Sequence, residues 1–419
     1  MDELLAKLRS YPGFPNIFIF ISATAPDPIK INFSQPAFKG LTLREDLLQE
    51  FPSLERYIYL NTASIGLVPR RTIEAIRDFS ERAMREGSAY LDEDMEEGIF
   101  EELRRASSRL MKCDEDDVAI FSSVTEAINS LAWALRGGGK IISTSLEFPS
   151  LIYPWIRVGK EKNWSLELLK SDLLVDEDEL LKRITEGVRA VCLSHVEFLT
   201  GQRLNLREIA ERAHEVGSLL IVDGIQAAGC IPIDVKSLDV DFYVFGGYKW
   251  LLGPMGAAAA YIREELSDEL EPGIVGWRSV EDMWSLDASS MRYSRGARKF
   301  EYGTSSYDSK VGLAKSIEYL LEIGIESIHE RDMRVSERLM ERIREIEGIK
   351  IVTPQNRGPI VTIEADRPYD LLKMMERGGR KLIASVRRGL IRFSIHLYND
   401  YEDVEEASDR LAEAVKSLS

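Results

Sequence analysis

The sequence predicts an α/β fold, in which a mostly parallel, doubly wound sheet forms a large domain and a smaller α+β domain follows. Two observations predict this fold. From about residue 70 to residue 300, helical and strand patterns alternate, and the strand-like segments are apolar throughout, as in strands that helices cover on both faces. Spacers long enough for a helix favour parallel pairing with right-handed crossovers.

The expected elements of the large domain follow one another in chain order. Helices are predicted at residues 72–85, 125–135, 151–161, 180–186 and 206–216, and strands at residues 117–121, 140–143, 165–169, 190–194, 218–223, 240–245 and 257–262. The glycine triplet at residues 137–139 follows a helix and precedes a strand. We interpret it as a turn, because a phosphate-binding loop has the opposite order.

The pattern changes towards the carboxyl end, where long helices separate fewer strands. Helices are predicted at residues 310–323, 328–347, 369–376 and from 401 to the end, and strands at residues 350–352, 359–364 and 390–394. We therefore expect an N-terminal arm at residues 1–40, a large domain at residues 41–301 and a small α+β domain at residues 302–419. Prolines at positions 26, 28 and 36 favour an extended arm.

Composition limits the class of partner. The chain has 419 residues and is 44% hydrophobic, as in ordinary globular proteins. Lysine and arginine number 54 and aspartate and glutamate 70, which gives a formal net charge of −16. An acidic surface repels phosphodiester backbones and anionic lipids, so we expect neither a nucleic-acid nor a membrane partner.

Cysteine and histidine usage favours a reducing compartment and no metal site. Cys113, Cys192 and Cys230 form no Cys-x-x-Cys pair. The four histidines show no metal-ligand spacing. Acidic residues and prolines interrupt the segment near the amino terminus, and its apolar run is shorter than a signal core, so we expect a cytoplasmic protein.

Two polar residues follow apolar strands of the predicted sheet. Asp223 ends the apolar segment 219–222, and Lys249 comes after the segment 243–245 and two glycines. Ligands of doubly wound sheets bind beyond the carboxyl ends of the strands. A lysine amine isolated beside aromatic rings has a lowered pKa, which suits a Schiff-base nucleophile. Taken singly, Asp223 also fits a turn cap and Lys249 a surface side chain.

A third strand end runs directly into a helix. Residues 122–129 read Ser-Ser-Val-Thr-Glu-Ala-Ile-Asn. Free backbone N–H groups at the start of a helix attract a phosphate group. The segment also fits a plain N-cap at Ser123 or Thr125.

Four motifs occur in a distinctive order: Val-Thr-Glu-Ala-Ile-Asn at 124–129, Glu-Phe-Pro-Ser at 147–150, Val-Asp-Gly-Ile-Gln-Ala-Ala-Gly at 222–229 and Gly-Tyr-Lys-Trp at 247–250. Together they resemble the class V aminotransferase family, whose members are fold-type I enzymes dependent on pyridoxal 5′-phosphate (PLP). The resemblance extends from residue 59 to residue 399. It implies the PLP-dependent transferase fold type I, PLP as cofactor and an amino acid as substrate.

The resemblance assigns roles to the matching residues. Lys249 would carry PLP as a Schiff base and move the Cα proton. Asp223 would pair with the pyridinium nitrogen, and Gln226 would donate to the phenolic oxygen. Phe148 would stack on the ring, and Arg392 would bind the substrate α-carboxylate, because a guanidinium matches that planar anion.

The resemblance also implies residues around the phosphate. Val124 and Thr125 would hold it at the start of a helix, with the hydroxyl of Tyr248 as a further donor. Thr304, in Phe-Glu-Tyr-Gly-Thr at 300–304, matches a family segment whose threonine reaches the phosphate of the neighbouring subunit. This implies a homodimer. Thr304 also fits an N-cap of the following helix.

The motifs leave the reaction open. Cysteine desulfurases have a nucleophilic cysteine in the loop before the carboxylate-binding arginine, and residues 383–389 contain none. The desulfurase asparagine near the ring aligns with Phe198. The segments around Phe148 and Tyr248 look like the isopenicillin N epimerase-like and kynureninase-like branches, although Leu151 replaces an aspartate of kynureninases.

We therefore expect a homodimeric PLP enzyme that forms a Cα carbanion on an amino acid, in first place an aminotransferase. The alternative is an enzyme similar to cysteine desulfurases or selenocysteine lyases that works without the loop cysteine, or another lyase or epimerase of the family. A binding protein that has lost catalysis is disfavoured, because Lys249, Asp223 and Gln226 are all present.

Overall fold

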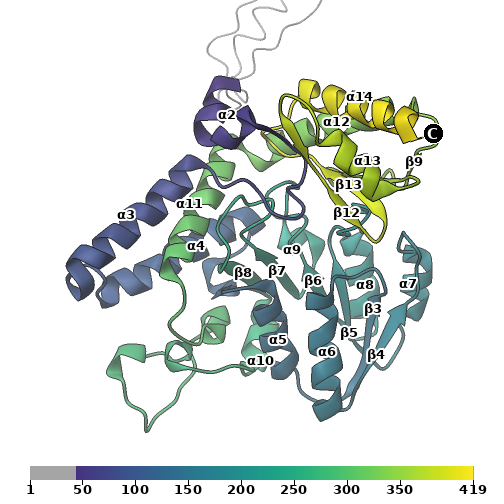
Figure 1. The fold of residues 1–419 in the computed structure, drawn as a ribbon. Helices are drawn as coiled ribbons and strands as arrows, with labels where there is room; N and C mark the ends of the chain where they lie inside the picture. Colours follow the sequence, from purple (N-terminus) through teal and green to yellow (C-terminus); the bar gives the residue numbers. More distant parts are fainter. Residues whose placement is uncertain (1–43, 419) are drawn as a thin grey trace, which may run out of the picture. The chain divides into compact units, whose positions relative to one another are not determined.

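The computed structural model of the chain describes residues 44–418, so the predicted arm at residues 1–40 lies outside the described residues. It confirms the predicted fold class. A seven-stranded sheet with helices on both faces precedes a small antiparallel sheet with helices of its own (Figure 1). The predicted boundary at residue 301 stays a prediction.

The large sheet has the strand order β2-β8-β7-β6-β5-β3-β4. Its strands are β2 (Val118–Phe121), β3 (Gly139–Thr144), β4 (Trp164–Leu169), β5 (Val188–Ser194), β6 (Leu219–Asp223), β7 (Phe242–Gly246) and β8 (Ala258–Ile262). β8 runs antiparallel to both of its neighbours, and all other neighbouring pairs are parallel. The expectation of parallel pairing was wrong for β8, because the spacer between β7 and β8 forms turns instead of a helix.

The predicted helices of this part of the chain are present, together with four helices that were not predicted. They are α2 (Arg44–Glu50), α3 (Arg70–Glu86), α4 (Glu93–Met111), α5 (Val124–Ala134), α6 (Pro149–Lys162), α7 (Glu177–Arg183), α8 (Leu206–Glu215), α9 (Val235–Leu238), α10 (Glu264–Glu269) and α11 (Tyr307–Ile323). The four additions are α2, α4, α9 and α10. Asp92 caps α4, the longest of them, by accepting a hydrogen bond from the Met95 N–H.

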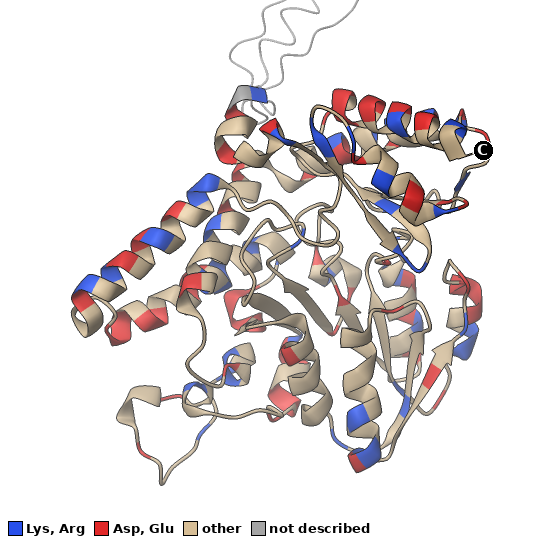
Figure 2. Cartoon of the chain, in the orientation of Figure 1, with Lys and Arg blue, Asp and Glu red and all other residues tan. Residues whose placement is uncertain are grey.

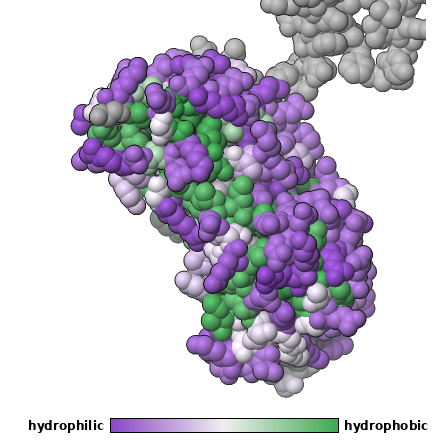
Figure 3. Space-filling model, turned by 90° about the vertical axis from the view of Figure 1, so that its right-hand side faces the viewer, coloured by the Kyte–Doolittle hydropathy of each residue, from purple (hydrophilic) through white to green (hydrophobic). Residues whose placement is uncertain are grey.

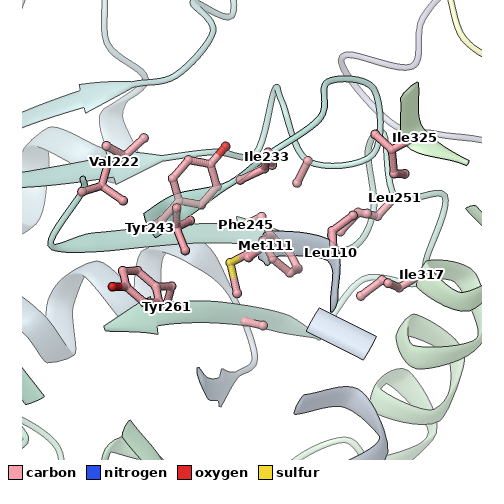
Figure 4. Packing of buried hydrophobic residues seen from close by; sticks show 14 of the residues in the cluster. Leu110, Met111, Val222, Ile233, Tyr243, Phe245, Leu251, Tyr261, Ile317 and Ile325 are labelled. Atoms are coloured by element: carbon pink, nitrogen blue, oxygen red, sulfur yellow. The ribbon is translucent and has the colours of Figure 1, made fainter. Parts of the chain in front are cut away.

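The core lies on both faces of the large sheet. Figure 4 shows Leu110 and Met111 of α4 and Ile317 of α11 around Tyr243 and Phe245 of β7. The alternate residues of β7 belong to a second cluster, which includes apolar side chains of α5 and α6. In Figure 2 the central strands are almost free of charged residues, which colour the helices instead. Both faces of the sheet are therefore buried, as the apolar strands predict.

The small sheet is antiparallel and has the order β12-β13-β10-β9. Its strands are β9 (Lys350–Ile351), β10 (Ile360–Glu364), β12 (Ser385–Arg387) and β13 (Leu390–Ser394), and its helices are α12 (Ile325–Arg344), α13 (Pro368–Met375) and α14 (Tyr401–Leu418). A separate parallel pair joins β1 (Tyr57–Tyr59) to β11 (Lys381–Ile383). The sequence prediction missed β1, β11 and β12, which have only three residues each.

The described surface is mixed in character. On the face that Figure 3 shows, hydrophilic side chains predominate and hydrophobic atoms form smaller areas between them. Within residues 44–418, every helix is too short or too polar to cross a membrane. The same residues contain no group of three or more histidine, cysteine or acidic side chains arranged to hold a metal ion.

Candidate active site

The structure brings the predicted site residues to one edge of the large sheet. Asp223 ends β6, Lys249 follows β7, and Phe148 lies between β3 and α6. Val124 begins α5, and a connection of two residues separates it from β2. Because β2, β3, β6 and β7 run in the same direction, their carboxyl ends meet at this edge, where ligands of such sheets bind.

Lys249 and Asp223 form a buried pair of opposite charge. Their exposed fractions are 9% and 2%. Burial lowers the pKa of Lys249 to about 8, and Asp223 opposes that shift. Burial raises the pKa of Asp223 to about 6, and the Lys249 ammonium opposes that shift. At mildly alkaline pH the amine is therefore largely neutral and nucleophilic, beside a fixed negative charge.

Aromatic rings surround the Lys249 amine. Its Nζ lies 5.8 Å from the ring centroid of Phe148 and 5.8 Å from that of Tyr248. The ring of Phe148 packs edge-on against Phe198, with 5.6 Å between the centroids. Phe148 is nevertheless 47% exposed, which is unusual for a phenylalanine beside a buried amine. Its ring therefore offers a surface on which a flat ligand can stack.

Gln226 is held from two sides. Its Nε2 donates to the Ala63 carbonyl at 3.1 Å, and its Oε1 accepts from the Trp250 indole at 2.7 Å. The side-chain amide has two N–H groups, so one remains for a ligand. The tryptophan that follows Lys249 thus fixes the orientation of Gln226.

The start of α5 has a defined cap. Ser123 accepts a hydrogen bond from the Glu126 N–H at 3.1 Å, which confirms Ser123 as the N-cap residue. Thr125 instead donates its hydroxyl to Ser150 at 2.9 Å. The N–H groups of Val124 and Thr125 belong to the first turn and have no acceptor within the helix, so this helix start fits an anion such as phosphate.

Thr304 is exposed. Tyr302, two residues before it, has its hydroxyl in hydrogen-bond contact with Glu126 of α5. The hydroxyl of Thr304 itself contacts Tyr307. The N-cap of α11 is Ser306, so the N-cap interpretation of Thr304 was wrong. Its contact with a neighbouring subunit stays a prediction.

Arg392 is a buried cation without an acidic partner among residues 44–418. Its exposed fraction is 2%, and its Nη1 donates to the Phe198 carbonyl at 2.6 Å. Its Nη2 donates to the Ser64 hydroxyl at 2.8 Å, and its Nε has no partner. Burial, followed by the nearby Arg387, lowers the pKa of Arg392 to about 9. A buried guanidinium in this state fits an anionic group of the substrate.

Two buried carboxyl groups were not recognised as site residues from the sequence. Glu147 follows β3 and accepts hydrogen bonds from the Ser194 N–H at 2.7 Å and the Ser194 hydroxyl at 2.5 Å. Glu197 follows β5, and neither oxygen of its buried carboxyl group has a hydrogen-bond partner within residues 44–418. Burial raises the pKa of both groups, and the nearby Glu147 carboxylate raises that of Glu197 further. The signal in the sequence was a carboxylate just beyond each of two strands that proved to be neighbours.

These groups fit PLP. The neutral amine of Lys249 suits its aldehyde, and the buried carboxylate of Asp223 suits a protonated ring nitrogen. The exposed ring of Phe148 suits its flat heterocycle, and the start of α5 suits its phosphate. The fit rests on charge and burial that the chain shows without any ligand.

Fold and site together define the chain as a fold-type I enzyme. The sequence profile of the Aminotransferase class-V family matches residues 58–407, and the chain belongs to this family. Among curated proteins, it is 28% identical to a "probable cysteine desulfurase" of Pyrococcus abyssi, over 90% of this chain and 99% of that protein. It is also 28% identical to the "uncharacterized aminotransferase YcbU" of Bacillus subtilis, over 88% of this chain and 98% of that protein.

Solved structures agree with this assignment. The cysteine desulfurase of Thermococcus onnurineus matches with a TM-score of 0.80 and 25% identity, over 90% of this chain and 99% of that chain. C-DES, described as a cystine C–S lyase in complex with its product cysteine persulfide, matches with a TM-score of 0.78 and 25% identity, over 87% of this chain and 99% of that chain. A mutant of C-DES with glycine covalently linked to its PLP cofactor shares the fold, with 24% identity and a TM-score of 0.79 over 87% of this chain and 99% of that chain.

The comparisons correct one part of the sequence analysis. The relatives named above are cysteine desulfurases, a C–S lyase and an aminotransferase, so they do not support the isopenicillin N epimerase-like or kynureninase-like branch. The family assignment is confirmed. The desulfurase alternative is supported better than the aminotransferase interpretation, which the likeness to YcbU favours.

Proposed function

We propose that the chain is a PLP-dependent lyase that cleaves the Cβ–S bond of an amino acid by β-elimination, without a persulfide on the enzyme. The observation that carries the proposal is the buried Lys249–Asp223 pair next to the unpaired guanidinium of Arg392. The likeness to desulfurases and to a C–S lyase supports sulfur amino acids as substrates.

The cysteines of the chain explain why the sulfur leaves with the product. Cys192 and Cys230 are fully buried, and burial raises the pKa of both thiols. Cys113 packs against the large core, and burial raises its pKa to about 12. None of them lies in residues 383–389, which form the end of β11, β12 and the turn that follows it. A thiol must ionise to accept sulfur, so these side chains do not suit persulfide chemistry.

The residues of the chain would act as follows. Arg392 binds the α-carboxylate of the substrate, and Lys249, as a neutral amine, takes the Cα proton. Asp223 would hold the ring nitrogen of PLP in its protonated form, and PLP, when bound, would supply the electron-withdrawing ring that makes the Cα proton acidic. The electron pair of the Cβ–S bond leaves with sulfur, and the remaining aminoacrylate is hydrolysed to pyruvate and ammonia.

We also propose a homodimer in which Thr304 reaches the phosphate site of the partner. The exposed position of Thr304 supports this arrangement, because a hydroxyl buried in its own chain could not reach a neighbouring subunit. Transamination is the second candidate reaction, and the likeness to YcbU favours it.

Product analysis separates the two reactions. Purified protein with PLP is incubated with S-substituted cysteines, and pyruvate, ammonia and thiol are measured with and without added 2-oxo acid. We expect the three products in equal amounts without 2-oxo acid, and none with Lys249→Ala. Turnover that requires a 2-oxo acid and leaves the C–S bond intact would establish transamination instead.

A further inference from the structure

Two guanidinium groups converge on one neutral oxygen at the edge of the site. The Ser64 hydroxyl accepts from Arg392 Nη2 at 2.8 Å and from Arg387 Nη2 at 3.2 Å. It donates its own hydrogen to Asn61 Oδ1 at 2.8 Å. Both lone pairs of this oxygen are thus used by cations, and a neutral hydroxyl cannot balance their two charges.

The β12–β13 hairpin fixes the two arginines side by side. Ser385 lies opposite Arg392 and Arg387 lies opposite Leu390, so Arg387 and Arg392 share one face of the hairpin. Arg388 and Gly389 form the turn with φ angles of 49° and 80°, the left-handed pair of a two-residue hairpin turn. Figure 2 shows this tip of the hairpin in blue.

The third arginine of the hairpin already has an acidic neighbour. Arg388 lies over the Phe198 ring at 5.7 Å, and its charge lowers the pKa of the buried Glu197. Arg387 and Arg392, in contrast, form no ion pair with the carboxylates of residues 44–418, and each lowers the pKa of Lys249. Both charges therefore act on the place where the substrate reacts.

The charges do not balance for a substrate with one carboxylate. The α-carboxylate of an amino acid neutralises one guanidinium, and Asp223 faces the positive charge of Lys249 or of the cofactor ring. The guanidinium of Arg387, which is exposed at the edge of the site, then remains without a carboxylate next to the bound substrate. Guanidinium groups recognise carboxylates by paired N–H donors. The remaining cation thus fits a second acidic group on the substrate itself.

We propose that the substrate is an S-substituted cysteine whose sulfur substituent ends in a carboxylate. Arg392 binds the α-carboxylate, and Arg387 binds the carboxylate of the substituent. This inference rests on the proposed β-elimination. Lys249 takes the Cα proton, the Cβ–S bond breaks with its electron pair going to sulfur, and the leaving thiolate carries the second carboxylate away. No oxidant or reductant is needed.

Two probes of nearly equal size test the proposal. S-carboxymethyl-L-cysteine carries the second carboxylate, and S-carbamoylmethyl-L-cysteine replaces it with a neutral amide. For the wild-type holoenzyme we expect kcat/KM to be at least about tenfold higher for the carboxymethyl compound. In Arg387→Gln, we expect this preference to disappear, with kcat/KM for the carbamoylmethyl compound changed less than about threefold.

A matched variant and a third substrate complete the experiment. Arg377→Gln removes an exposed arginine in the turn after α13 and should keep the preference. β-Chloro-L-alanine has a small leaving group without a carboxylate, so its conversion to pyruvate tests the proposed elimination alone.

The outcomes are distinguishable. Equal turnover of the two thioethers by the wild type, with β-chloroalanine converted to pyruvate, would overturn the second carboxylate and leave the lyase intact. Equal loss of both thioether activities in Arg387→Gln would overturn the role of Arg387. No pyruvate from any of the three compounds would overturn the proposed elimination, and this inference with it.

Discussion

Asp223→Asn tests how much the buried charge of Asp223 lowers the free energy of unfolding of the cofactor-free protein. The substitution removes the buried negative charge and keeps the size of the side chain. An asparagine Oδ1 can still accept the Ile225 N–H, which now donates to Asp223 Oδ1 at 2.9 Å. The variant therefore changes charge with little change in packing.

The size of the effect follows from the pKa of Asp223. Burial raises this pKa from 3.8 to about 6. Each pKa unit corresponds to about 1.4 kcal/mol, so the ionised carboxylate destabilises the cofactor-free protein by about 3 kcal/mol. The sign follows from protonation. Below pH 3.8 the group is neutral in both states, the penalty develops between pH 3.8 and about 6, and it stays constant above.

We therefore expect cofactor-free Asp223→Asn to be more stable than the wild type. Urea unfolding at pH 9 should show a gain of up to about 3 kcal/mol, and at pH 3.8 or below almost none. We choose pH 9 because Lys249, with a pKa of about 8, is then mostly neutral, so its attraction to the Asp223 carboxylate contributes little to stability. The lyase activity of the variant with PLP should fall on the order of 10²-fold.

The opposite results would refute this reasoning. A cofactor-free Asp223→Asn variant that is less stable than the wild type at pH 9 would show that the carboxylate stabilises the fold. A gain in stability that does not change between pH 3.8 and 9 would show that its origin is packing and not charge.

Three further predictions concern stability, pH and sulfur transfer. Glu301→Gln leaves the buried Arg104 without the carboxylate that lies 2.8 Å from its Nη2, so urea unfolding should show a free energy of unfolding lower by about 3–5 kcal/mol. The control Glu97→Gln, at a partly exposed ion pair, should change it by less than about 0.5 kcal/mol. A loss below about 1 kcal/mol for Glu301→Gln would contradict this expectation. The rate at which PLP reconstitutes the cofactor-free protein should rise with pH with a midpoint near 8, since only the neutral Lys249 amine reacts, and a rate independent of pH between 7 and 9.5 would argue against it. Cys113→Ser should release thiol and pyruvate at the wild-type rate, because the Cys113 thiol has a pKa of about 12, and loss of activity would point to a persulfide there.

The residues that could be predicted from the sequence are those whose neighbours in the chain define them. Asp223 and Lys249 each follow an apolar strand, and parallel strands bring their carboxyl ends together. The seven strands of the large sheet were predicted from apolar segments for the same local reason. The direction of β8 was not, because the spacer of residues 247–257 is long enough for a helix but forms the turn that carries Lys249.

The residues that could not be predicted depend on contacts between distant parts of the chain. Ser64 meets Arg387 and Arg392 across more than 320 residues, through a hairpin whose first strand is too short to show a pattern. Glu147 and Glu197 meet because β3 and β5 are neighbours in the sheet. The contacts of Ser64 have no signature in the local sequence. The two glutamates each follow a predicted strand, but their proximity depends on the strand order, which the local sequence does not give.

The proposed function requires an imine between PLP and one particular lysine, Lys249. Borohydride reduces such an imine to a stable amine, so the reduced protein can be digested and its labelled peptide identified by mass spectrometry. We expect one labelled site, Lys249, with one PLP bound per chain. A label on another lysine, or a protein that takes up no PLP under these conditions, would contradict it.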